Sequence, residues 1–131
     1  MALQYSTTVN NARLDQIETT ISTTPSLLIF SGSAPANCAA ADTGTLLATL
    51  VLPSDWMAAA SAGAKALAGS WTGTASSGSA ATPTHFRIKQ GGTCHIQGTA
   101  GIGSGDLQVN GTITSGQTVT VTAFTITAAN T

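Results

Sequence analysis

A cysteine and a histidine stand side by side in the stretch GGTCHIQGTA, residues 91–100, of a chain that has only two of each. Such a pair could bind a metal ion, or the imidazole could activate the thiol as a nucleophile. However, HFRIKQ at 85–90 and CHIQGT at 94–99 read as the two strands of a hairpin, and neighbouring side chains on a strand point to opposite faces. We therefore interpret Cys94 as a small buried side chain and His95 as part of a polar face.

The apolar pattern of this hairpin sets its register. With a three-residue loop at 91–93, Ile88 lies opposite Ile96, and Cys94 lies opposite Gln90 on the same apolar side. A register shifted by one residue would break this apolar pairing. The other side of the hairpin then carries four polar side chains: Arg87, Lys89, His95 and Gln97.

A zinc site is the sharper alternative, with Cys38, His85 and Cys94 as ligands together with one more residue. Structural zinc sites favour ligand pairs that are separated by only about two to four residues. The two cysteines lie 56 positions apart in this chain. The spacing therefore argues against a zinc site, and we expect neither a metal nor a cofactor.

The acidic residues do not form a recognisable acid–base pair. Three lie in or beside predicted turns, where an aspartate commonly hydrogen-bonds to its own backbone, and two occupy solvated positions of a predicted helix. The run GIGSGD at 101–106 precedes a strand, so it lacks the helix N-terminus that would hold a phosphate. No G-x-S-x-G elbow occurs either, and we expect no catalytic residues. The acidic residues are Asp42, Asp55 and Asp106 in the turns, and Asp15 and Glu18 in the helix.

The two tryptophans, Trp56 and Trp71, flank a stretch rich in alanine and glycine. As exposed platforms for sugar rings they would indicate a carbohydrate-binding module. Tryptophan more commonly anchors a core or an interface, because its large ring buries much apolar area. We favour anchoring for both side chains.

Residues 8–21 have the pattern of an amphipathic helix, since Leu14, Ile17 and Ile21 fall on one face. Thr7 or Thr8 is the expected N-cap, and Pro25 ends the segment because it disfavours helical geometry at the residue before it. A helix of this length is not stable alone. Its apolar stripe must pack either on its own domain or on a neighbouring subunit, and the sequence leaves both open.

From residue 25 onward, short apolar or alternating runs are separated by turns rich in glycine and serine. About seven such strands predict a mainly β domain, an antiparallel β-sandwich of the jelly-roll or immunoglobulin-like kind, at 25–131. The N-terminal arm, 1–24, carries the helix. In the last strand the alternation changes phase, which predicts a β-bulge near Ala123. The clearest runs are at 26–31, 45–53, 85–90, 94–99, 105–117 and 117–127.

Charged residues make up only 7% of the chain, and the net charge is −1, against about 25% in typical domains. Without a basic cluster, nucleic-acid binding is not expected, and no apolar run is long enough to cross a membrane. The N-terminus lacks the pattern of a Sec signal, so we expect synthesis in a cytoplasm. Cys38 and Cys94 are then expected to be free thiols, with a disulfide as the alternative.

Four segments resemble a family of small proteins that tailed bacteriophages and prophages encode among their virion structural genes. The segments are MALQYSTTVNNARLDQIETTI, SGSAPANCAAADTGTLLATLVLP, HFRI and ITSGQTVTVTAFTIT. The resemblance implies a capsid decoration (cement) protein or a minor head protein. It brings no catalytic residues.

In that role the chain would be made in the host bacterial cytoplasm and bind the major capsid protein on the capsid exterior, as a dimer or trimer. Alternatives are a tail or head–tail connector component and a carbohydrate-binding adhesion module. The residues we expect at an interface are Leu3, Tyr5, Leu14, Ile17, Ile21, Trp56 and Trp71.

Overall fold

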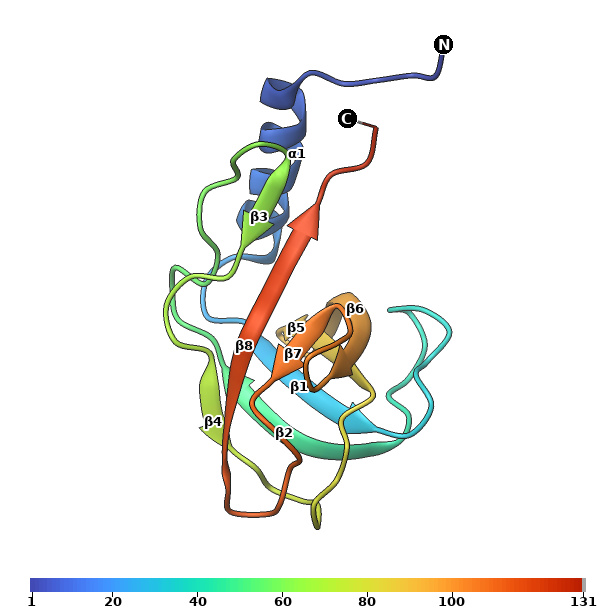
Figure 1. The fold of residues 1–131 in the computed structure, drawn as a ribbon, viewed down its shortest axis with the longest axis vertical. Helices are drawn as coiled ribbons and strands as arrows, with labels where there is room; N and C mark the ends of the chain where they lie inside the picture. Colours follow the sequence, from blue (N-terminus) through green and yellow to red (C-terminus); the bar gives the residue numbers. More distant parts are fainter. Residues whose placement is uncertain (131) are drawn as a thin grey trace.

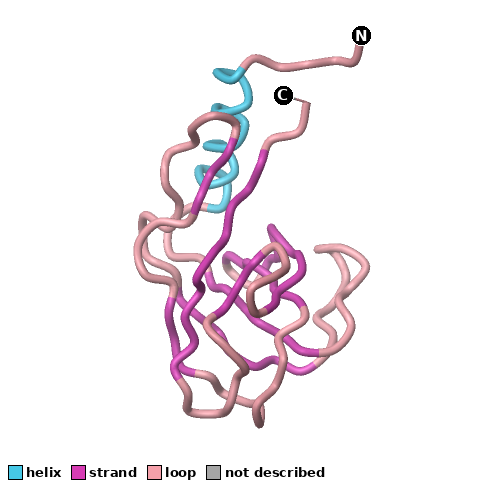
Figure 2. Tube along the Cα trace, in the orientation of Figure 1, coloured by secondary structure: helices cyan, strands magenta, loops and turns pink. Residues whose placement is uncertain are grey.

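The computed structural model describes residues 1–130, so the last residue of the predicted domain 25–131 lies outside the described residues. One helix is followed by eight strands (Figures 1 and 2). The expectation of a mainly β chain with one N-terminal helix is confirmed. In chain order the elements are α1 Thr7–Ile21, β1 Ser26–Ser31, β2 Thr45–Val51, β3 Ala64–Ala66, β4 Thr72–Thr74, β5 His85–Gln90, β6 Thr93–Gly101, β7 Leu107–Val109 and β8 Thr118–Thr127.

Helix α1 begins one residue before the predicted start. Its N-cap is Ser6, whose hydroxyl accepts a hydrogen bond from the Val9 N–H at 3.2 Å, so the expectation of a threonine cap was wrong. The helix ends where Ser22 adopts a φ of 76°, and the Ser22 N–H donates to the Glu18 carbonyl. Pro25 follows three residues later, as the sequence indicated.

The strands form a single curled sheet in the order β2-β1-β5-β6-β7-β8-β3, and β4 pairs with β8. A bridge between Ala48 and Ala75 brings the chain after β4 beside β2, which shows how far the sheet curls. The β6–β7 pair is parallel and the other strand pairs are antiparallel. The expectation of wholly antiparallel pairing was therefore wrong. The curled sheet mixes parallel and antiparallel strand pairs.

The turn at 102–106, within the run GIGSGD, explains the parallel pair. Parallel neighbours are normally joined by a crossover of about a dozen residues or more, but here Ala100 pairs with Leu107. The chain reverses twice in this short distance, and Gly103 and Gly105 supply the positive φ angles of 70° and 90° that the reversals need. The glycines of this run serve the turn geometry.

The β5–β6 hairpin keeps the predicted pairing of Ile88 with Ile96. Its loop is shorter than expected, since Gln90 pairs with Thr93, and a bulge shifts the register so that Lys89 faces Cys94. The placement of Cys94 opposite Gln90 on the apolar side was therefore wrong. The extra residue in β6 puts the Cys94 side chain on the same side as Lys89.

The phase change in β8 is also present. Leu107 pairs with Phe124 and Val109 pairs with Val121, so β8 has one extra residue between these pairs, at 122–123. The bulge lets Val121 and Phe124 both face the interior, where they are 5% and 4% exposed. The predicted bulge near Ala123 is confirmed.

The core fills the inside of the curl, with both tryptophans in it. Trp56 and Trp71 are 0% and 1% exposed, and their rings lie 6.0 Å apart between centroids. Each indole N–H has a carbonyl partner, which satisfies the polar group of a buried tryptophan. The largest fully buried apolar side chains are Trp56, Trp71, Phe86, Leu27, Ile29, Leu47, Leu50, Leu52, Met57 and Ile88.

Candidate functional site

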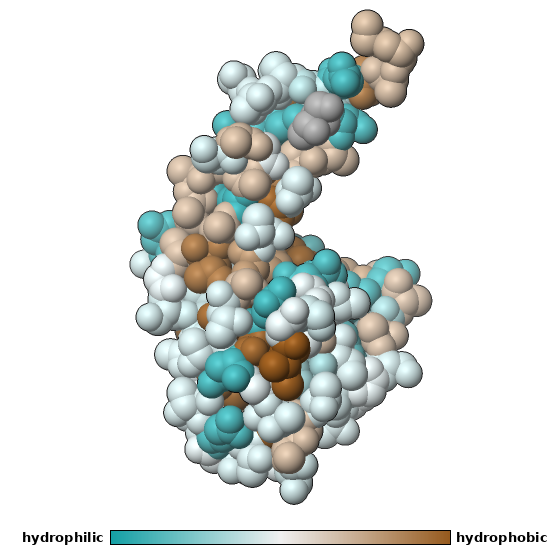
Figure 3. Space-filling view, in the orientation of Figure 1, coloured by the Kyte–Doolittle hydropathy of each residue, from teal (hydrophilic) through white to brown (hydrophobic). Residues whose placement is uncertain are grey.

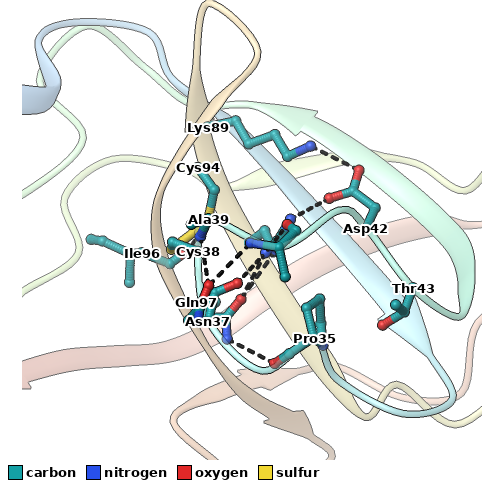
Figure 4. A network of polar contacts seen from close by, with 12 residues as sticks. Pro35, Asn37, Cys38, Ala39, Asp42, Thr43, Lys89, Cys94, Ile96 and Gln97 are labelled. Carbon is teal, nitrogen blue, oxygen red and sulfur yellow. Dashed lines mark hydrogen bonds and ion pairs between the residues drawn. A yellow bond between two sulfur atoms is a disulfide. The ribbon is translucent and has the colours of Figure 1, made fainter.

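The loop at 32–44, which joins β1 to β2 and is called the clamp loop here, is held against the β5–β6 hairpin by Arg87. Figure 4 shows Asp42 of this loop facing Lys89 of the hairpin, and Cys38 beside Cys94. The Arg87 side chain is only 2% exposed. Its Nη1 lies 2.6 Å from Asp42 Oδ1, and its Nη2 donates to the carbonyls of Asn37 and Ala40 at 2.8 and 2.9 Å. Both Nε and Nη2 also donate to Gln97 Oε1. Each of the three guanidinium nitrogens of the buried cation thus has at least one acceptor.

Other contacts complete this polar cluster. Lys89 Nζ lies 2.7 Å from the second carboxylate oxygen of Asp42, and Gln97 Nε2 donates to the carbonyl of Pro35 at 3.0 Å. The hydrogen bond from Lys89, and then that from Arg87, hold the pKa of Asp42 below its ordinary value, although burial opposes them. Asp42 therefore stays charged under ordinary conditions and neutralises two cations.

The clamp loop is also bonded covalently to the hairpin. Cys38 and Cys94 form a disulfide whose Cα atoms are 5.2 Å apart. Our expectation of free thiols was wrong, because the bulge in β6 turns Cys94 toward the clamp loop and away from the core. Cys94 is consequently neither a buried apolar side chain nor a thiol available for catalysis.

A second charged cluster lies between α1 and β3. Lys65 Nζ is 2.7 Å from Asp15 and 3.0 Å from Glu18, and it also donates to the carbonyl of Ala58. Burial opposes the charge of Lys65, but its hydrogen bonds to the two carboxylates outweigh burial and raise its pKa. The hydrogen bond from Lys65, together with one from the Ala60 N–H, lowers the pKa of Asp15. We expected Asp15 and Glu18 at solvated helix positions; in the structure both are paired with Lys65, and these ion pairs attach α1 to β3.

These clusters use most of the charge that the chain has. Three of the four basic side chains and three of the five acidic ones form these ion pairs. Arg13 donates to Asn10 and to the Ala129 carbonyl, and Asp106 accepts from the N–H and hydroxyl of Thr99. The visible surface is mostly of intermediate hydropathy, with small polar and apolar patches (Figure 3).

The two histidines lie in different places. His85 is buried and stacks on Phe30 with ring centroids 4.9 Å apart; its Nδ1 lies 3.1 Å from the Thr84 hydroxyl. His95 lines an open groove beside α1, with Ile17 and Ile21 among its neighbours. No group of three or more potential metal-ligating side chains occurs within residues 1–130. The structure does not bring Cys38, His85 and Cys94 together as a metal site, since the two cysteines are bonded to each other.

The seven interface candidates divide into two groups. Leu14, Ile21, Trp56 and Trp71 are at most 3% exposed and pack inside this chain, and Ile17 packs against the same core. Helix α1 thus packs on its own chain, beside β3 (Figure 1). Leu3 and Tyr5 are 69% and 37% exposed and are the two candidates that a partner could reach.

The sequence reasoning missed both charged clusters. For the cluster around Lys65, the available signal was a lysine in the apolar stretch at 54–73, since a buried lysine requires acidic partners. For the cluster around Arg87, the presence of Arg87 and Lys89 on one side of a strand signalled a nearby acid, but sequence spacing did not identify Asp42. Comparisons with models of protein families, with curated proteins and with solved structures find no match. Among the described residues, no helix is long and apolar enough to cross a membrane.

Proposed function

We propose that this chain is a structural protein of a bacteriophage virion, a capsid decoration protein that binds the lattice of the major capsid protein and stabilises the head. The observation that carries this proposal is that most charged side chains form ion pairs within the chain. The ion pairs of Asp42 and of Lys65 occupy most of the charged side chains. Most side chains left on the surface are uncharged, and several large apolar ones are exposed, which suits permanent packing against other proteins better than life as a separate monomer.

The disulfide between Cys38 and Cys94 supports a place on the capsid exterior. Disulfides persist in oxidising surroundings, virion surfaces included, and are rare in a reducing cytoplasm. A chain made in the host cytoplasm would form this bond after the particle is released.

The mechanism is thermodynamic linkage. A protein that binds only the assembled lattice shifts the equilibrium toward that lattice, by an amount that grows with its concentration relative to its dissociation constant. Nothing in this mechanism requires a reactive group. Shape and apolar contacts are sufficient.

The test is to purify the particles made by the genome that encodes this chain and to measure its copy number by quantitative mass spectrometry. A decoration protein is present in many copies over the shell, and particles that lack it release their DNA at a lower temperature. A few copies in a ring would identify the connector alternative, and absence from particles would refute both.

The carbohydrate alternative gains no support from the tryptophans. Trp56 and Trp71 are buried in the core, so neither presents a flat ring to a sugar.

A further inference from the structure

The curled sheet has a gap beside β7. This strand has three residues, whereas its neighbours β6 and β8 have nine and ten. Beyond Phe124, therefore, β8 has no strand on its β7 side, although β3 continues to pair with its other side. Figure 1 shows β8 rising past the short β7 toward the end of the molecule that carries α1.

The backbone of β8 presents hydrogen-bonding groups to this gap. Phe124 and Ala128 bond to the β3 side, through the Phe124 carbonyl and the Ala128 N–H. Because backbone groups alternate along a strand, the N–H and C=O of Thr125 and Thr127 point the other way, into the gap. Both residues are exposed, and neither is paired with β7.

The gap, called the β8 groove here, has an apolar floor. It has a volume of about 320 Å³ and lies between β6 and the last residues of β8. Figure 3 shows the molecule hollowed between the α1 end and the body of the sheet. Its floor is formed by Phe86, Ile96, Phe124 and Ile126, and Gln97 and Asp106 lie at its rim. A free strand edge above an apolar floor is the arrangement that binds an added β-strand.

The N-terminal segment, residues 1–4, has the properties of such a strand. It is extended, carries no charged side chain, and leaves Leu3 69% exposed. Its root is fixed, because the Tyr5 N–H donates to the Asn130 carbonyl and Arg13 lies 4.8 Å from the Tyr5 ring centroid. From this root the segment projects outward at the top of α1 (Figure 1). It is therefore presented to a neighbouring molecule.

We propose that residues 1–4 of one copy of this chain add a β-strand to the β8 groove of a second copy. The backbone of the segment pairs with Thr125 and Thr127, and Leu3 packs on the floor formed by Ile96, Phe124 and Ile126. Exchange in both directions gives a dimer, and passing the segment around a ring gives a higher closed oligomer. This self-association does not depend on the capsid role.

The experiment measures the molar mass of the full chain by sedimentation velocity over a range of concentrations. Wild type self-associates. Leu3→Asp places a charge on the apolar floor, and Thr125→Pro removes the free N–H of the edge without breaking a bond to β3; each variant is monomeric. Two matched controls, Ile102→Asp at another exposed apolar residue (44% exposed) and Thr125→Ala, associate as wild type does.

Mixing the two monomeric variants provides the decisive result. Leu3→Asp retains an intact groove and Thr125→Pro retains an intact segment, so the mixture forms a one-to-one complex. A labelled peptide with the sequence MALQYS binds Leu3→Asp at least about tenfold more tightly than it binds a Leu3→Asp, Thr125→Pro double variant. Circular dichroism checks the fold of each variant.

The proposal is overturned if wild type is a monomer at every concentration, if Leu3→Asp associates as wild type does, or if the mixture forms no complex. None of these results bears on whether particles contain the chain, which the copy-number measurement decides separately.

Discussion

Gly98 shows how a single missing side chain shapes the interior. A Cβ at this position would lie 2.8 Å from Asp106 Oδ2 and 2.9 Å from Phe86 Cε1. We expect Gly98→Ala to lower the free energy of unfolding by about 1–3 kcal/mol, because the buried ring and the carboxylate must both shift. Gly111→Ala is the matched control, since a Cβ there has no neighbour within 4 Å. Equal urea midpoints for the two variants would contradict this account.

Arg87 and Lys89 share one carboxylate but differ in burial. Arg87→Met removes the donor that Gln97 and the two clamp-loop carbonyls use, so we expect a loss of about 3 kcal/mol. Lys89→Met removes the partly exposed ion pair with Asp42, and we expect the free energy of unfolding to fall by less than about 1 kcal/mol. Urea unfolding at neutral pH measures both. A larger loss for Lys89→Met than for Arg87→Met would show that the buried cluster has little influence on stability.

The lowered pKa values of Asp15 and Asp42 predict how stability depends on acid. Both carboxyls titrate below their ordinary value of 3.8 in the folded chain. The stabilisation they contribute is therefore complete above that value and is lost as the pH falls through the folded pKa. We expect a urea midpoint that is constant between about pH 5 and pH 8 and that decreases below about pH 4. A midpoint unchanged at about pH 3 would refute this expectation.

The raised pKa of Lys65 affects stability at high pH. The stabilisation that charged Lys65 contributes to the folded chain is complete below its ordinary pKa of 10.5 and is lost only as the pH rises through the higher folded pKa. Neutral and mildly basic solutions should thus leave the cluster between α1 and β3 intact.

At the scale of elements, the clamp loop depends on two kinds of bond, the disulfide and the Arg87 hydrogen bonds. We expect the double variant Cys38→Ser, Cys94→Ser to fold, because Arg87 and Gln97 still hold the loop, but to lose about 2–4 kcal/mol of stability. Hydrogen exchange should become faster at 33–44 and change little in β1. Reduced wild type is the control and should match the variant. An unfolded variant would show that the hydrogen bonds alone do not hold the loop.

The strand pattern shows what could be predicted from sequence and why. Strand β1 has the same bounds as the predicted run at 26–31, because Pro25 and Gly32 limit where a strand formed by this short apolar run can begin and end. The bulge in β8 was visible as a change of phase, because alternation records which side faces the core. The bulge in β6 was not, since Cys94 and His95 give no clear apolar signal in either register.

The parallel β6–β7 pair was missed because it depends on an uncommon turn, about which local pattern carries no information. The disulfide was the alternative to the free thiols that we expected, because the sequence argued for a cytoplasmic setting and could not show that Cys38 and Cys94 meet. The polar side of the hairpin was predicted correctly for Arg87 and Gln97, yet the clamp loop that covers it could not be inferred from composition alone.

For the whole molecule, the pairing of most charged side chains within the chain predicts that binding to a shell depends only weakly on salt concentration. If the surface that meets a shell is largely uncharged, screening has little to act on. We expect the affinity of the purified chain for particles that lack it to change less than about threefold between low and high ionic strength. Binding measured by co-sedimentation tests this expectation. A steep loss of affinity with salt would show that exposed charges make the contact.

The position of α1 between distant parts of the chain has a consequence for synthesis on the ribosome. Arg13 bonds to a carbonyl 116 residues further along, and Asp15 bonds to an N–H 45 residues further along. The helix emerges before β3 and β8 but cannot dock until both have been translated, and a lone segment of this length is mostly unfolded in water. Its apolar stripe is therefore open to chaperones, or to nascent neighbours on the same messenger RNA, until β8 has emerged.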